Sequence, residues 1–252
     1  MADIYGPTGA AFYDAASSRL RGSSGDSAFY LSLAKKTGGP VLELGCGSGR
    51  VLLPIARTGI PCTGLDPSRT MLARLRKNDP PSSLRLVQER MQDFDLPGER
   101  FALIYSAFRA FQHLLTVEDE LSCLAAVRRH LAPKGIFALD VFAPKLDRIA
   151  VFREPEFPEL QWKEGETQVR RLTSVARNPA TQVFEVRFRH EIRRPGKRPE
   201  SRTVRTKMRW LFRYELEHLL ARAGFTGIQV FGGFDRRSYD YFSGETVVIA
   251  RT

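Results

Sequence analysis

The sequence has 252 residues, a net charge of +11 and 42% hydrophobic residues, which is enough apolar content for one large folded domain with a buried core. No apolar run approaches the roughly 20 residues needed to span a bilayer, so the composition excludes a helical membrane protein. The first residues, MADIYGPTGAAFYD, do not resemble a secretory signal, and the three cysteines (Cys46, Cys62, Cys123) lack the spacing of a metal site or a disulfide framework, so we expect a cytoplasmic protein without a bound metal.

Strands and helices alternate through residues 1–147. Two helices are predicted within 7–36, broken around Gly22–Gly25, with Asp26 as the cap of the second. Further helices are predicted at 48–57, 66–77 and 116–131, and apolar strands at 40–44, 60–65, 84–87, 101–106 and 136–142. This alternation is typical of βαβ units in a doubly wound, Rossmann-like α/β sheet that binds ligands at the carboxyl ends of its strands.

The pattern changes over residues 148–212. Three β-like runs, at 166–177, 181–193 and 201–212, follow one another without an intervening helix. In the second run apolar and charged residues alternate, which indicates an antiparallel strand with one buried face. We therefore expect an antiparallel insertion here. Residues 213–252 then return to the core with a helix (214–223) and two strands (227–231 and 246–250), which completes a mostly parallel sheet of seven strands.

Positive charge is concentrated in the insertion. Residues 151–214 contain 16 Lys and Arg against 8 Asp and Glu, a net charge of +8. Solvated strand faces account for such a composition, and this is the interpretation we favour. The alternative is a surface that recruits nucleic acid or another anionic partner.

The segment VLELGCGSGR at 41–50 is the most informative motif. Gly45, Gly47 and Gly49 follow a strand directly and lead into a helix, as a backbone that approaches a ligand closely requires. Asp66 ends the second strand, where a carboxylate can accept hydrogen bonds from both hydroxyls of a ribose. The two features together predict a nucleoside-containing ligand.

The GxGxG spacing, with Glu43 two residues before the first glycine, resembles the S-adenosylmethionine (SAM) motif of class I methyltransferases rather than the dinucleotide fingerprint. MQDFDL, RFALIYSAFRAFQHLLTVEDE and RRHLAPKGIFALDVF resemble later motifs of the small-molecule "methyltransferase domain" type. The resemblance covers residues 40–145 well and 213–252 more loosely. The insertion between the fifth and sixth strands resembles that of bacterial small-molecule N-methyltransferases, including those that act on amino sugars.

The resemblance implies SAM as the cofactor. It places the cofactor-binding residues on the glycine loop and at the ends of the following strands: Glu43, Gly45, Cys46, Gly47, Gly49, Asp66, Pro67, Met71, Met91, Gln92 and Ser106. Relatives usually carry an acid after the third strand that accepts the adenine amino group. Arg90 stands at that position here, so adenine recognition is expected to fall to Gln92 or to the Met91 backbone.

Two catalytic candidates follow from the same resemblance. His113 lies after the fourth strand, where it either accepts a proton or is a structural histidine. Tyr13 lies on an N-terminal helix that covers the site in relatives, where it either closes over SAM or packs on the core. Four further residues are candidates for acceptor binding: Phe108, Arg109, Tyr239 and Tyr241.

The expected function is transfer of a methyl group from SAM to N or O of a small-molecule acceptor, by a monomer or a homodimer. Two alternatives stay open. One is a nucleic-acid or protein methyltransferase that uses the basic insertion. The other is a non-catalytic SAM-binding protein, an option kept open by Arg90. The sequence does not specify the acceptor.

Overall fold

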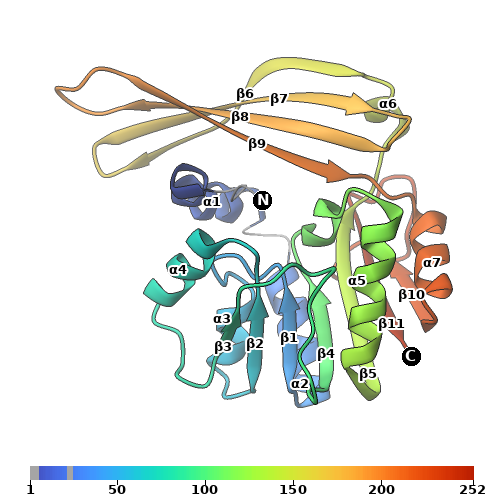
Figure 1. Cartoon of the computed structure of the whole chain (residues 1–252). Coiled ribbons are helices and arrows are strands. Elements are labelled where there is room, and N and C mark those ends of the chain that lie inside the picture. Colours follow the sequence, from blue (N-terminus) through green and yellow to red (C-terminus); the bar gives the residue numbers. More distant parts are fainter. Residues whose placement is uncertain (1–5, 22–24) are drawn as a thin grey trace.

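The computed structural model describes residues 6–21 and 25–252, which form a seven-stranded sheet between helices and a separate four-stranded sheet (Figure 1). The large sheet has the order β10-β11-β5-β4-β1-β2-β3. β11 alone runs antiparallel to its neighbours. The strands are β1 (Val41–Leu44), β2 (Cys62–Leu65), β3 (Arg85–Val87), β4 (Phe101–Ser106), β5 (Leu131–Phe142), β10 (Thr226–Phe231) and β11 (Glu245–Arg251). The predicted Rossmann-like fold is confirmed.

Helices cover both faces of this sheet. The described helices are α1 (Gly6–Arg21), α2 (Asp26–Thr37), α3 (Leu52–Ala56), α4 (Arg69–Lys77), the short 3-10 helix η1 (Ala110–His113), α5 (Val117–His130), α6 (Leu146–Ile149) and α7 (Arg213–Arg222). Alternate residues of β1 point to opposite faces: Leu42 and Leu44 pack with α5 and α7, and Val41 packs with α2 and α3. Within the described residues, every helix is too short or too polar to cross a membrane.

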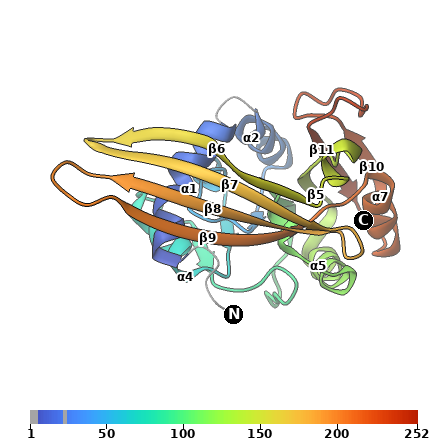
Figure 2. The same ribbon diagram turned by 90° about the horizontal axis from the view of Figure 1, so that it is seen from above.

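The insertion forms an antiparallel sheet of four consecutive strands, β6 (Arg153–Glu164), β7 (Thr167–Asn178), β8 (Val183–Arg193) and β9 (Glu200–Arg209). We call it the roof sheet, because it extends over the carboxyl ends of the core strands with α1 beneath it (Figures 1 and 2). Three of its strands match the predicted runs. β6 was not predicted, and it contains Pro155 and Pro158, which are unfavourable inside a sheet. It is tolerated at an edge, with pairing irregularities around the two prolines.

Two helix starts depend on short polar side chains. Thr116, the first residue of the predicted helix at 116–131, caps α5, because its hydroxyl accepts the Asp119 N–H at 3.1 Å. The helix predicted from residue 66 begins later, at Arg69, since Ser68 is the cap and accepts the Met71 N–H at 3.1 Å. The prediction of Asp26 as a cap was wrong: Gly25 holds that position, and the Asp26 carboxylate pairs with Arg50 instead.

A buried polar network attaches the roof sheet to the core. The Arg209 guanidinium at the end of β9 donates to both carboxylate oxygens of Glu120 on α5, at 2.8 and 2.9 Å, and also pairs with Glu215 on α7. Gln112 of η1 donates to the Arg209 carbonyl at 2.9 Å. Since Glu120 and Gln112 are completely buried, these contacts hold β9, α5, α7 and η1 together in a region closed to water.

Candidate functional site

A cavity of about 710 Å³ lies between the roof sheet, α1 and the carboxyl ends of the core strands. This is where a doubly wound sheet binds its ligand. The cavity lining includes most of the site residues predicted from the sequence: Tyr13, Glu43, Gly45, Cys46, Gly47, Asp66, Pro67, Met71, Met91, Phe108, Arg109 and His113.

Three predicted cofactor residues are not part of the lining. Gly49 packs beneath the loop, where a Cβ atom would meet Leu53 and Leu75 at 2.9 Å. The Gln92 side chain lies against the Arg90 guanidinium, and Ser106 is fully buried. The glycine at 49 thus serves the packing of the loop against α3 and α4.

Tyr239 and Tyr241, predicted to contact the acceptor, also lie outside the cavity lining. Tyr239 packs against Arg213, whose guanidinium carbon lies 5.5 Å from the ring centre. Tyr241 is 69% exposed on the loop between β10 and β11. The sequence order places this loop near the carboxyl edge of the sheet. The cavity, however, is lined on that side by residues of the roof sheet and not by this loop.

The glycine loop turns sharply at the end of β1. Gly45 has φ +75°, and its N–H and that of Cys46 donate to the Leu65 carbonyl at 2.7 and 3.0 Å. A Cβ atom on Gly45 would lie 2.7 Å from the Cβ of Ala110 in η1. The absent side chain therefore allows η1, which ends in His113, to pack directly on the loop.

We expect Gly45→Ala to disrupt the cavity, and Gly98→Ala is the matched control. Gly98 has nearly the same φ, +78°, but its Cβ would meet nothing within 4 Å. Left-handed strain costs about 1–2 kcal/mol in both variants, whereas only Gly45→Ala adds the collision with η1. Thermal unfolding and calorimetric ligand titration should show a larger loss for Gly45→Ala. Equal losses in the two variants would contradict the packing argument.

Two acids lie beside the glycine loop. Asp66 accepts the N–H groups of Gly47 and Ser68, each at 2.8 Å, which orients its carboxylate along the cavity wall. Glu43 on β1 accepts the Tyr105 hydroxyl at 3.0 Å. Burial raises the pKa of the Glu43 carboxyl well above its usual range, although Tyr105 and Arg50 act in the opposite direction. Asp66 thus faces the ligand space as an oriented hydrogen-bond acceptor.

Helix α1 closes the cavity from the side. Asp14 accepts the Ser48 hydroxyl at 2.5 Å and pairs with the Arg74 guanidinium of α4 at 2.7 Å. These contacts tie α1 to the glycine loop and place Tyr13 in the cavity lining. The Tyr13 ring lies edge-on to the Phe108 ring, with the ring centres 6.2 Å apart.

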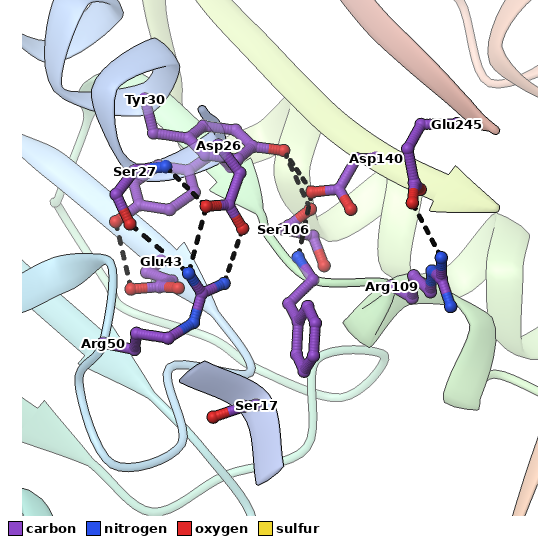
Figure 3. Close-up of polar contacts among 12 residues, drawn as sticks. Ser17, Asp26, Ser27, Tyr30, Glu43, Arg50, Ser106, Arg109, Asp140 and Glu245 are labelled. Atoms are coloured by element: carbon purple, nitrogen blue, oxygen red, sulfur yellow. Dashed lines mark hydrogen bonds and ion pairs between the residues drawn. The ribbon is translucent and has the colours of Figure 1, made fainter. Parts of the chain in front are cut away.

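Arg50, which was not singled out from the sequence, connects α2 to this aromatic pair. Its guanidinium donates to both carboxylate oxygens of Asp26, at 3.0 and 2.6 Å (Figure 3). The guanidinium carbon lies 4.9 Å from the centre of the Phe108 ring. Arg50, which itself lines the cavity, thus links Phe108 to α2.

The turn after β4 is strained and held by a buried acid. Phe108 and Arg109 both adopt positive φ, 54° and 65°. Asp140, fully buried on β5, accepts the Phe108 N–H at 2.9 Å and the Tyr30 hydroxyl at 2.8 Å. Arg109 pairs with Glu245 at 2.7 Å (Figure 3). These contacts fix the Phe108 ring in the cavity.

His113 ends η1 beneath the roof sheet. Its Nδ1 lies 3.1 Å from the Lys207 carbonyl oxygen, which can only accept, so Nδ1 carries the proton and Nε2 carries the lone pair. Burial lowers the pKa of His113, with the Lys207 contact acting in the opposite direction. The imidazole is therefore a neutral proton acceptor at physiological pH.

The stretch after β3 also lines the cavity, through Gln88, Glu89, Arg90 and Met91. Arg90, which stands where relatives carry an acid, pairs with Asp93 at 3.2 Å. Glu89, one residue earlier, brings a carboxyl group to the lining. Sequence reasoning missed Glu89 because it relied on the position of the acid in relatives.

Comparisons with known proteins agree with this geometry. Residues 41–135 match the family described as "Methyltransferase domain". The chain is 28% identical to the cypemycin N-terminal methyltransferase of Streptomyces sp. over 56% of this chain and 57% of the relative. The chain spans about half the length of the curated relatives it matches.

Solved structures match over more of the chain. The CcbJ methyltransferase from Streptomyces caelestis has 25% identity and a TM-score of 0.77, over 91% of this chain and 89% of that one. The glycopeptide N-methyltransferase MtfA, complexed with S-adenosylhomocysteine, has 26% identity and a TM-score of 0.55, over 91% and 90%.

The residues present fit SAM. Asp66 offers an acceptor to ribose hydroxyls, and the Cβ-free positions at 45 and 47 leave room for a ligand beside Met71 and Met91. SAM is thus the cofactor that fits this site. Residues 41–135 are similar to the methyltransferase-domain family, and the chain shares its fold with the methyltransferases of 25–26% identity named above.

Proposed function

We propose that the protein transfers a methyl group from SAM to a nitrogen atom of a small-molecule acceptor. The observation that carries this proposal is the size of the cavity beneath the roof sheet. Its volume of about 710 Å³ is in the range of small-molecule sites, roughly 300–1,000 Å³, and donor and acceptor must share it. The roof sheet and α1 leave room for an acceptor of modest size. The names of the similar proteins support the same class of acceptor.

The donor occupies the half of the cavity next to the glycine loop. Asp66 accepts hydrogen bonds from the ribose hydroxyls, and Glu89 accepts from the adenine amino group, in place of the acid replaced by Arg90. When bound, SAM supplies an electrophilic methyl group on a positively charged sulfur. The chain contributes mainly position, because aligning the reacting atoms in a dry cavity lowers the barrier.

The acceptor lies beneath the roof sheet, beside Phe108, Tyr13 and His113. When SAM supplies its methyl group to the acceptor nitrogen, that nitrogen would have a proton to lose, and Nε2 of His113 would accept it. The lowered pKa of His113 makes it a weak base. A weak base is adequate for an ammonium-type proton and poor for an alcohol, which favours nitrogen over oxygen.

The basic insertion does not favour a nucleic-acid acceptor. Ten of the sixteen Lys and Arg side chains of residues 151–214 form ion pairs: Arg170, Arg171, Arg177, Arg189, Arg194, Arg202, Arg205, Lys207, Arg209 and Arg213. A Lys or Arg side chain whose charge is already balanced by a carboxylate attracts a phosphate group less strongly. We also propose a cytoplasmic location and a monomer or homodimer, and the three buried, free cysteines agree with a reducing compartment.

We expect His113→Asn to slow methyl transfer by about 100-fold while SAM affinity stays unchanged. For the wild type, kcat/KM should fall as the pH drops through the lowered pKa of His113, because protonated imidazole cannot accept a proton. The variant should lack this acid limb. Release of S-adenosylhomocysteine from a panel of small amines and phenols measures both. Equal rates at every pH would make His113 structural, and SAM binding without transfer to any acceptor would indicate a non-catalytic protein.

A further inference from the structure

The face of the roof sheet that lines the cavity carries a polar cluster, made of Glu159, Arg171, Thr173 and His190. Arg171 on β7 and His190 on β8 are direct cross-strand partners. Directly paired residues on one face of a sheet have neighbouring side chains. The cluster is thus a compact polar spot in the ceiling of the cavity.

The members of the cluster contact one another, and three of the four are buried. Arg171 Nε donates to Glu159 Oε2 at 2.9 Å, and the Thr173 hydroxyl donates to the same oxygen. The His190 ring stacks on Phe12 of α1, with ring centres 4.7 Å apart. Arg171 is 5% exposed and His190 is 3% exposed. These groups are therefore held in place before any ligand arrives.

Two nitrogen atoms of the cluster lack a hydrogen-bond partner within the described part of the chain. They are Nδ1 of His190 and Nη2 of Arg171, which lies 2.8 Å from Glu159 Oε2 but outside hydrogen-bonding geometry. Buried polar atoms without a partner are rare in folded proteins and call for an explanation. Because both side chains line the cavity, a ligand oxygen supplies the simplest partner.

The charges of the cluster indicate the kind of oxygen. Glu159 neutralises Arg171, so a carboxylate or phosphate would be repelled by Glu159 and a cation by Arg171. Burial and the Arg171 charge lower the pKa of His190 to about 4, so its ring is neutral at physiological pH. A hydroxyl group matches best, since it accepts from the nitrogen donors and donates to a carboxylate.

The cluster is well separated from the proposed proton acceptor. Thr206, which lies 3.5 Å from His113 Nδ1, is the cross-strand partner of Val186, four residues along β8 from His190. Four residues of strand span about 13 Å. A molecule that reaches both points must be elongated, with its polar end far from the atom that is methylated.

We propose that Glu159, Arg171 and His190 form a subsite that binds an uncharged hydroxyl-bearing part of the methyl acceptor, at the end remote from the reacting nitrogen. This inference rests on the proposed function and specifies its substrate class as an amine that carries a polyhydroxylated group.

The test measures binding without turnover. The wild-type protein, saturated with S-adenosylhomocysteine, is titrated by NMR with methyl glucoside as a neutral polyol and with methyl glucuronide as its carboxylate counterpart. His190→Phe keeps the ring that stacks on Phe12 and removes the nitrogen atoms. The matched control is His218→Phe, at an exposed histidine of α7 outside the cavity lining.

We expect the polyol to bind the wild type and His218→Phe with equal affinity. It should bind His190→Phe about tenfold more weakly. For the wild type, the affinity for the glucuronide should be lower than the affinity for the polyol. Unchanged melting temperature and S-adenosylhomocysteine affinity show that His190→Phe is folded. Equal polyol affinity in both variants, preference for the carboxylate, or no polyol binding would overturn the subsite. None of these results depends on methyl transfer, so a failure of the proposed function is recognised separately in the acceptor screen.

Discussion

Replacement of Asp66 by alanine will weaken SAM binding by about 1–3 kcal/mol, through the loss of charge-assisted hydrogen bonds to the ribose. The structure adds a second cause. The Asp66 carboxylate accepts the N–H groups of Gly47 and Ser68, so its removal leaves two donors unpaired beside the cofactor. The glycine loop is then less well ordered for binding, which places the expected loss toward the upper end of the range.

Calorimetric titration with SAM, S-adenosylhomocysteine and NAD⁺ measures this effect. Asp235→Ala is the control, because Asp235 is exposed on the loop after β10 and lies outside the cavity lining. We expect the wild type and the control to bind both sulfur compounds and not NAD⁺. Unchanged SAM affinity in Asp66→Ala would show that Asp66 does not contribute to SAM binding.

The core sheet and the glycine loop could be predicted because their signals are local. Apolar strands followed by capped helices set the βαβ order, and Thr116 marked the start of α5 correctly. Gly45 and Gly47 were recognised because a sharp turn next to a ligand leaves no room for side chains. Such features depend on residues close together in the sequence, so one sequence suffices to find them.

The ceiling of the cavity could not be predicted in the same way. Arg171 and His190 meet only after two strands pair in one register. The alternation in the run at 181–193 predicts a buried face, but it does not show which residues of another strand lie beside that face. Tyr239 and Tyr241 illustrate the opposite case: they are close in sequence to the carboxyl edge of the sheet, yet the roof sheet encloses the cavity without them. Glu120 lies within the predicted helix at 116–131, but its partner Arg209 is 89 residues away, so the sequence does not reveal the pair.

The buried ion pair between Glu120 and Arg209 is expected to have the largest effect on stability. Arg209→Met removes the cation that compensates Glu120, which is fully buried, and breaking such a pair costs about 3–5 kcal/mol. Arg194→Met is the matched control on the roof sheet, since its pair with Glu200 is more than one-third exposed on both sides and is worth about 0–1 kcal/mol. Urea unfolding of both variants measures the difference. A similar small loss in both would show that the buried network contributes little.

The loss in Arg209→Met depends on pH. Burial, with the nearby charge of Glu215, raises the pKa of Glu120 to about 7 even with Arg209 present. Without Arg209 the pKa of Glu120 in the folded state rises further. Above pH 7 the folded variant therefore keeps a proton on Glu120. The folded wild type and both unfolded chains release this proton. The stability difference should therefore be smallest below about pH 6, where Glu120 is protonated in both folded proteins, and should grow as the pH rises. A difference that shrinks with rising pH would contradict this assignment.

The double variant Glu120→Leu/Arg209→Met distinguishes the effect of the ion pair on the stability of the protein from its effect on the position of β9. Replacing both charges by apolar side chains leaves no buried charge on α5, so most of the lost stability should return. The backbone carbonyl at position 209 still accepts from Gln112, and the contacts of Lys207 and Thr206 with His113 still join β9 to η1, but the ion pair that anchors the end of β9 is gone. If stability returns while methyl transfer stays slow, the network serves to keep the Lys207 carbonyl against His113 and the roof sheet in register over the cavity. If both return together, the ion pair is replaceable, and the shape of the cavity is set by the apolar packing of the core and roof.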